Sequence, residues 1–222
     1  MSRVTKPVDR IQTNLLASAE RRLLNWMCAR LPRSITPDDL TALGFFGALV
    51  IAAGYILSAW NVTWLWLSIL GYVIHWVGDS LDGSVARYRQ IERPKFGYFI
   101  DHSTDALANL IYLSALGATP FIRLDVALLG LIGYFMLSIH AFLAARVVGE
   151  MRLSYLAGGP TELRLILITM TLLMIFVGNV PTYIPNVSAY DLFVLGVASL
   201  MIALFVIQTT NTAKALIRRG EE

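Results

Sequence analysis

Residues 79–105 read DSLDGSVARYRQIERPKFGYFIDHSTD and place four aspartates, Asp79, Asp82, Asp101 and Asp105, between long apolar runs. An aspartate at the centre of a membrane helix costs ~3 kcal/mol on a translocon-type scale, so four of them would cost ~12 kcal/mol. That cost is comparable with the ~5–15 kcal/mol net stability of a whole domain. Something must compensate these carboxylates, and a divalent metal is the natural candidate.

The composition around this stretch is that of an integral membrane protein. Of the 222 residues, 56% are hydrophobic and 15% are charged, and the mean hydropathy is +0.63, whereas soluble domains are about one quarter charged. Six runs approach the ~20 residues that a spanning helix needs, namely residues 40–60, 62–78, 106–122, 126–145, 165–184 and 192–208. We therefore predict an all-α integral membrane fold with six transmembrane helices, the second and third of which include the aspartate motif.

An amphipathic helix is expected before the first span. Within residues 10–31, apolar side chains recur at spacings of three and four while most charges lie elsewhere on the helical wheel, as in helices that lie in the membrane interface. Thr36, Pro37, Asp38 and Asp39 then supply an N-cap, a proline at the first helical position and two acids in the first turn,. We expect residues 1–35 to form a cytoplasmic segment with the interfacial helix, and residues 36–222 to form one membrane domain.

The basic residues predict the orientation. All but Arg123 of the 18 Lys and Arg residues lie before the first span, between the second and third, between the fourth and fifth, or at the C-terminal end. Short loops rich in Lys and Arg stay in the cytoplasm, so both termini and the aspartate motif are expected there. The net charge of +3 then describes a basic face suited to anionic lipid headgroups or phosphates, and not a nucleic-acid binder.

Two helical stripes combine carboxylates with small residues. The first carries two acids three residues apart, and the second carries a glycine and two acids at intervals of four, so each stripe lies on one helix face. Their members are Asp79, Asp82, Gly83 and Ala86 on the first and Gly97, Asp101 and Asp105 on the second. Oxygen ligands without His or thiolate favour Mg²⁺ or Mn²⁺, and two ions would balance the four carboxylates.

Three interpretations of these stripes are open from spacing alone. A two-metal site fits phosphoryl transfer, since paired ions clamp a pyrophosphate and stabilise the entering and leaving oxygens, and the small residues would let a nucleotide approach the backbone. A divalent-cation transporter could use the same aspartates. A structural ion-pair cluster with Arg87, Arg89 or Arg93 would explain the charges, but neither alternative explains the small residues on the same stripes.

The pattern Asp79-x-x-Asp82-Gly83-x-x-Ala86-Arg87, followed after nine residues by Gly97-x-x-x-Asp101-x-x-x-Asp105, resembles the complete signature of the CDP-alcohol phosphotransferase family. The resemblance implies transfer of a substituted phosphate from a CDP-linked donor to an alcohol or lipid acceptor in phospholipid biosynthesis, with release of CMP. It also implies a homodimer, and it makes the first three aspartates metal ligands.

The resemblance assigns further roles by position. The fourth aspartate, Asp105, would be a metal ligand or the base that deprotonates the alcohol, and we take it as the catalytic residue because a carboxylate within hydrogen-bond reach can accept that proton. A family element, Pro-Asn-x-x-Thr, appears as residues 37–41 with Asp38 in place of the asparagine. The nucleotide-binding residues are expected to be Thr41, Gly83, Ala86, Arg87 and Gly97.

Local features point to two different branches of the family. His102 and the segment Gly159-Pro160-Thr161-Glu162 resemble the choline and ethanolamine phosphotransferases, which use CDP-amino alcohols and diacylglycerol. The chain length instead resembles the bacterial branch, which uses CDP-diacylglycerol and a polar alcohol such as inositol phosphate, glycerol phosphate or serine. The donor is therefore left open.

Five further residues, His102 within the motif and four others later in the chain, complete the candidate site. His102 is a second candidate base, because imidazole titrates near neutral pH. Glu162 is a candidate acid or base on the acceptor side, or a helix cap. Candidates for binding a phosphate or the acceptor are Arg146, Arg152 and Arg164, because a guanidinium can donate two parallel hydrogen bonds to a phosphate. The presence of these arginines is explained about as well by the tendency of basic residues to lie in cytoplasmic loops.

Overall fold

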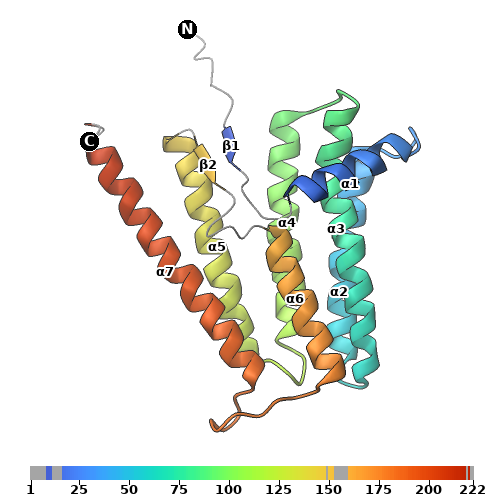
Figure 1. The fold of residues 1–222 in the computed structure, drawn as a ribbon, viewed down its shortest axis with the longest axis vertical. Coiled ribbons are helices and arrows are strands. Elements are labelled where there is room, and N and C mark those ends of the chain that lie inside the picture. Colours follow the sequence, from blue (N-terminus) through green and yellow to red (C-terminus); the bar gives the residue numbers. More distant parts are fainter. Residues whose placement is uncertain (1–8, 12–16, 149, 153–159, 219, 221–222) are drawn as a thin grey trace.

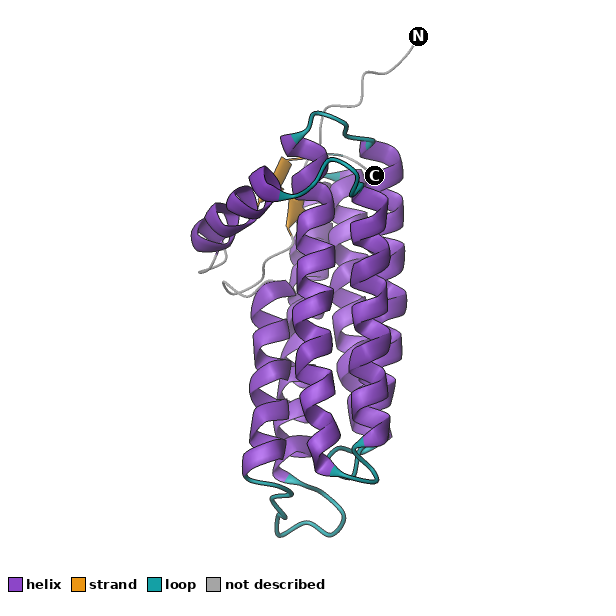
Figure 2. Cartoon of the chain, turned by 90° about the vertical axis from the view of Figure 1, so that its right-hand side faces the viewer, coloured by secondary structure: helices purple, strands orange, loops and turns teal. Residues whose placement is uncertain are grey.

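The computed structural model describes residues 9–11, 17–148, 150–152, 160–218 and 220. The bundle consists of α2 (Pro37–Leu57), α3 (Leu65–Tyr88), α4 (Pro94–Leu116), α5 (Leu124–Val147), α6 (Pro160–Phe176) and α7 (Ala189–Arg218). These helices run lengthwise beside one another, and α1 (Ala17–Arg30) lies across the upper part of α3 (Figures 1 and 2). The predicted helical fold is confirmed, and one helix overlaps each predicted span.

Membrane-crossing length and apolarity are clearest in three helices. By length and composition, α2, α5 and α7 qualify among the described residues. The other three helices are less apolar or shorter: α3 and α4 contain the aspartate motif, and α6 has 17 residues. The bundle is thus that of a membrane protein, and the number of six spans stays a prediction.

The N-terminal helix is shorter than the sequence predicts. Residues 10–31 were expected to be helical, but Asp9–Ile11 form a strand, β1, that pairs in parallel with β2 (Glu150–Arg152). The ladder aligns Asp9 with Glu150. Residues 10 and 11 are therefore part of a strand and not of the helix. The helix itself begins at Ala17, and its location in a membrane interface stays a prediction.

Helix α1 is fixed to the bundle along its length. Leu24 and Cys28 are buried in a cluster that includes Leu81 and Val85 of α3. Near its C-terminal end, the Arg89 guanidinium donates hydrogen bonds to the carbonyl oxygens of residues 31, 32 and 35 at 3.1, 2.9 and 2.6 Å. These bonds tie the segment that joins α1 to α2 to the end of α3. The helix therefore has a defined position relative to α3.

The start of α2 follows the predicted signal. Thr36 is the N-cap, its hydroxyl accepts a hydrogen bond from the Asp39 backbone N–H at 3.2 Å, and the Asp39 carboxylate accepts from the Thr36 backbone N–H at 2.8 Å. This reciprocal pair is a capping box. Because the helix begins here, Thr41 lies one turn inside it, facing α3.

Glycines let α2 and α3 approach closely. A Cβ at Gly44 would lie 3.0 Å from the backbone nitrogen of Asp79, and a Cβ at Gly71 would lie 2.8 Å from Cγ1 of Ile51. Small residues at such contacts replace side-chain layers by backbone packing. The close approach sets the height of Asp79 and Asp82 relative to α2.

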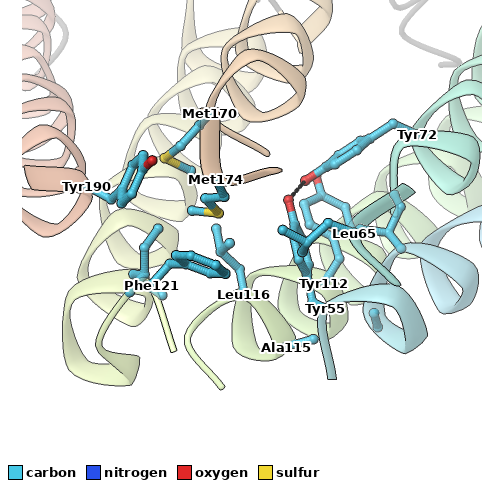
Figure 3. Packing of buried hydrophobic residues seen from close by; sticks show 14 of the residues in the cluster. Tyr55, Leu65, Tyr72, Tyr112, Ala115, Leu116, Phe121, Met170, Met174 and Tyr190 are labelled. Carbon is cyan, nitrogen blue, oxygen red and sulfur yellow. Dashed lines mark hydrogen bonds between the residues drawn. The ribbon is translucent and has the colours of Figure 1, made fainter. Parts of the chain in front are cut away.

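A buried aromatic cluster supports the site from below. The Tyr55 hydroxyl bonds the Tyr72 hydroxyl at 3.1 Å (Figure 3). It also bonds the Thr171 hydroxyl at 2.7 Å, so that these contacts join α2, α3 and α6. Tyr112 of α4 packs edge-on against Tyr72, with ring centroids 5.8 Å apart. The hydroxyls satisfy one another inside an apolar interior, where an unpaired polar group is costly. Four helices are thereby fixed in register beneath the aspartates.

Candidate metal and phosphate site

Three of the four motif aspartates converge. Asp79 comes from α3, and Asp101 and Asp105 lie one turn apart on α4. One carboxylate oxygen from each lies within 4.8 Å of the other two, and all three side chains are partly buried. Carboxylates this close repel one another unless a cation lies between them. A set of oxygen ligands without His or Cys fits Mg²⁺ or Mn²⁺.

The fourth aspartate is turned toward α2. Asp82 accepts a hydrogen bond from the Thr41 hydroxyl at 2.7 Å through one oxygen, and from the backbone N–H of Gly83 through the other. It is not part of the group of three, although it lines a small cavity together with Asp79 and Asp105. The structure therefore brings Thr41 and Asp82 together, as neighbours of the carboxylate group.

Arg164 closes the site from α6. Its Nη2 atom donates to Oδ2 of Asp79 at 2.8 Å, and the two side chains are only 11% and 21% exposed. This pair compensates part of the charge that the aspartates bring into the bundle. The sequence grouped Arg164 with Arg146 and Arg152, but Arg146 is exposed at the end of α5 and the side chain of Arg152 lies outside the described part of the chain.

The other nearby arginines have different partners. Arg93 pairs with Asp38 at the surface, and Arg87 donates to the Ser84 hydroxyl at 3.3 Å. Arg89 binds the end of α1, as described above. Arg87, Arg89 and Arg93 thus do not form the ion-pair cluster considered from the sequence; instead Arg164, 85 residues along the chain, pairs with Asp79.

The glycines of the two motif stripes are not packing contacts. A Cβ at Gly97 would meet nothing within 4 Å, and one at Gly83 would meet only the guanidinium of Arg87, at 3.2 Å. By contrast, Gly44 and Gly71 face backbone and side-chain atoms of the neighbouring helix. Since no helix among the described residues occupies the space at Gly83 and Gly97, both positions leave room for a ligand near the carboxylates. Ala86 lies one turn beyond Asp82 and is partly buried.

His102 and Glu162 lie around the site but outside the group of three. Nδ1 of His102 is 3.9 Å from Oδ2 of Asp101, and its ring packs against Tyr98 and Phe142, with centroids 4.5 and 5.0 Å away. Those aromatic contacts orient the imidazole toward α5. Glu162 lies in the first turn of α6, where a carboxylate interacts favourably with the helix dipole,.

A cavity of about 110 Å³ extends from the carboxylates into the bundle. Asp79, Asp105 and Arg164 line its polar end, and its walls are mostly apolar side chains of α4, α5, α6 and α7. The small cavity beside Thr41 and Asp82 lies on the α2 side. Asp79, Asp105 and His75 line both cavities, so the carboxylates lie between the larger cavity and the small one of about 10 Å³.

Sequence reasoning missed several polar residues of the larger cavity. They are His75, Asn109, Tyr112 and Tyr134. Asn109 continues the spacing of four from Asp101 and Asp105, so the sequence pattern could have identified it. Its amide donates to the backbone oxygen of Asp105 at 2.7 Å. The ring nitrogen Nδ1 of His75 lies 2.9 Å from the carbonyl oxygen of Gly44, which is the interhelical hydrogen bond typical of a histidine in an apolar span.

Two comparisons with known proteins agree with this geometry. A family model described as CDP-alcohol phosphatidyltransferase matches residues 34–208. The archaetidylinositol phosphate synthase of Pyrococcus horikoshii is 32% identical over 104 residues, which are 47% of this chain and 52% of that protein. The chain thus spans about half the length of this curated relative. The family model covers most of the bundle.

Proposed function

The chain belongs to the CDP-alcohol phosphatidyltransferase family, and from that premise we propose that it transfers a substituted phosphate from a CDP-linked donor to an alcohol hydroxyl, with release of CMP. The observation that carries the proposal is the group of Asp79, Asp101 and Asp105 within 4.8 Å, at the junction of two cavities. The alcohol oxygen bonds to the phosphorus, the bond from phosphorus to the CMP oxygen breaks, and the alcohol proton leaves. Family membership does not favour the transport interpretation.

Asp79 and Asp101 would hold a divalent cation, and Asp105 would lie beside it as a further ligand or as the base. When bound, Mg²⁺ or Mn²⁺ would stabilise the negative charge of the donor pyrophosphate. We infer a second ion from the fourth carboxylate, because Asp82 is close enough to share the small cavity with Asp79 and Asp105. Thr41, whose hydroxyl donates to Asp82, would orient that carboxylate beside the ion.

Asp105 is the proposed base. It lines both cavities, so its carboxylate can reach an alcohol in one and a phosphate in the other. A positioned carboxylate that accepts the alcohol proton makes the oxygen a better nucleophile at the moment of attack. His102 is the alternative base, but its ring packs against both Tyr98 and Phe142, which supports Asp105.

The two cavities support different occupants. The nucleotide would lie on the α2 side, where Thr41 and Asp82 lie, and would contact Gly83, Ala86, Arg87 and Gly97. The acceptor would enter the larger cavity, where Arg164 could leave Asp79 for a substrate phosphate once a cation neutralises that carboxylate. A guanidinium binds phosphate through two parallel hydrogen bonds. Arg146 and Glu162 would contact the acceptor near the entrance.

The name of the Pyrococcus horikoshii relative points to a polar acceptor that carries a phosphate, inositol phosphate. Arg164 at the polar end of an otherwise apolar cavity supports such an acceptor. We also propose that the protein is a homodimer, as the family resemblance implies. Both termini and the site would lie on the cytoplasmic side, as the distribution of Lys and Arg predicts.

The experiment that tests this function is CMP release by the purified protein with and without Mg²⁺. One set of reactions contains CDP-diacylglycerol with inositol phosphate, glycerol phosphate or serine, and the other contains CDP-choline or CDP-ethanolamine with diacylglycerol. We expect Mg²⁺-dependent CMP from the first set. CMP from the second set alone would move the protein to the amino-alcohol branch, and no CMP from either set would contradict the proposal.

Mg²⁺ or Mn²⁺ is expected to raise the melting temperature. A ligand that binds the native state alone stabilises it by ~2.7 kcal/mol at a concentration of 100 Kd, and the three carboxylates form such a site. Differential scanning fluorimetry in detergent would measure the shift, with KCl at equal ionic strength as the control. Asp101→Asn should abolish the metal shift, and a wild type without a shift at millimolar metal would count against a preformed site.

Gly83→Leu is expected to block nucleotide binding without unfolding the protein. The new side chain would displace only the tip of Arg87, yet it would fill the space beside Asp82, so CDP affinity should fall at least about tenfold, as for loss of ~1.4 kcal/mol. Binding of CDP in the presence of Mg²⁺ measures this effect. Gly196→Leu is the matched control, since that glycine also faces open space but lies in α7, away from the carboxylates; equal CDP affinity in both variants would contradict the assignment.

A further inference from the structure

We propose that Glu20 of α1 is a positioning residue that holds the start of α6 so that Arg164 meets Asp79. Its Oε1 atom accepts a hydrogen bond from Nε1 of Trp76 at 2.9 Å and from the hydroxyl of Thr161 at 3.1 Å. This inference rests on the proposed function, because it gives Arg164 the task of binding a substrate phosphate. It concerns a residue outside the family signature, on the N-terminal helix.

Glu20 joins the two helices that carry the buried ion pair. Trp76 lies three residues before Asp79 on α3, and Thr161 lies three residues before Arg164 on α6. Each contact of Glu20 is therefore less than one helical turn from one member of the Asp79–Arg164 pair. A shift of either helix would change both sets of contacts together.

The position of the Glu20 carboxylate is itself well defined. Helix α1 is buried against α3 through Leu24 and Cys28, and its C-terminal end is bound by Arg89. A carboxylate next to the first turn of α6 also interacts favourably with the positive end of that helix. Glu20 thus acts from a fixed helix on the start of α6, and α6 in turn carries Arg164.

The direction of the effect follows from what Arg164 does. Asp79 and Arg164 are largely buried, so the guanidinium has few alternative positions once α6 is fixed. Without Glu20 the first turn of α6 loses its hydrogen bond to α1 and, with it, the connection through Glu20 to Trp76 of α3. Arg164 is then less often aimed at the carboxylates. Substrate binding through Arg164 should weaken, while metal binding should not, because the aspartates stay on α3 and α4.

Steady-state CMP release is measured for wild type, Glu20→Ala, Arg164→Gln and the double variant, over ranges of both substrates and of Mg²⁺. We expect Glu20→Ala to raise the same KM that Arg164→Gln raises, by about tenfold, as for other residues that orient a ligand-binding side chain. In the Arg164→Gln background the same change should have less than about a twofold effect. The Mg²⁺ concentration for half-maximal rate should not rise in Glu20→Ala.

Two further variants separate positioning from a general structural role. Glu20→Gln keeps an oxygen that can accept both hydrogen bonds and should retain the wild-type KM. Asn25→Ala, on the exposed face of the same helix, should leave all kinetic constants unchanged. Equal loss in Glu20→Gln and Glu20→Ala, or an effect of Glu20→Ala that persists without Arg164, would overturn the proposal.

Unfolding midpoints of the same four proteins test the coupling independently of turnover. If Glu20 acts on Arg164 through α6, the two substitutions should not be additive in stability, since neighbouring contacts of one network couple. Additive midpoints would overturn the inference even if the enzyme assay fails. Coupled midpoints in a protein without CMP release would instead retain the positioning role and contradict only the proposed reaction.

Discussion

Asp105→Asn is expected to lower CMP release by about 10²–10⁴-fold, the range that a positioned general base contributes. Asparagine has the same shape and keeps an oxygen that can contact a cation, but it cannot accept the alcohol proton. Asp79 and Asp101 remain, so Mg²⁺-dependent CDP binding should be largely intact. The measurement pairs the CMP release rate with CDP affinity in the same preparation.

Asp125→Asn is the matched control for this variant. It makes the same chemical change in a carboxylate that is 65% exposed at the start of α5 and paired with Arg123, far from the aspartate group in the fold. We expect wild-type turnover from it. Loss of CDP binding together with preserved residual turnover in Asp105→Asn would show that Asp105 is a ligand and not the base.

Asp79→Asn and Arg164→Gln are both expected to destabilise the protein, but to respond differently to Mg²⁺. Removal of one partner leaves the other charge largely buried, which costs ~3 kcal/mol or more; here the two side chains are 21% and 11% exposed. In Arg164→Gln a cation can replace the lost guanidinium among the carboxylates, so Mg²⁺ should restore the melting temperature. In Asp79→Asn a metal ligand is lost as well, so Mg²⁺ should not.

Activity measurements separate the two variants further, and a variant in an exposed ion pair serves as the control. Asp79→Asn should be inactive at all Mg²⁺ concentrations, whereas Arg164→Gln should bind Mg²⁺ more tightly than wild type, because the guanidinium no longer competes for Asp79. Arg123→Gln removes one partner of a surface pair with 48% and 65% exposure, which solvent screens, and it should leave the melting temperature unchanged. Restoration of Asp79→Asn by Mg²⁺ would place the ion elsewhere.

Features that depend on residues close together in the chain could be predicted without a structure. The start of α2 was predicted from Thr36, Pro37 and Asp39, because a capping box involves residues three apart. The carboxylates of α4 were placed on one face because a spacing of four is a property of every α-helix. The beginning of α1 was predicted wrongly, since the ladder between Asp9–Ile11 and Glu150–Arg152 joins segments that no local pattern connects.

The chemistry of the site could be predicted from the order of residues alone: which helix faces carry oxygen ligands, which positions are small, and that buried charge requires compensation. The partners of these residues depend on how the helices pack. The tertiary structure paired Asp79 with Arg164 and not with the arginines near it in sequence, turned Asp82 toward Thr41, and brought Glu20 to α3 and α6. Helical periodicity tells which side of a helix a residue lies on, but the partner across an interface depends on how closely helices pack and at what height, which here follows from glycine contacts such as Gly44 against Asp79,.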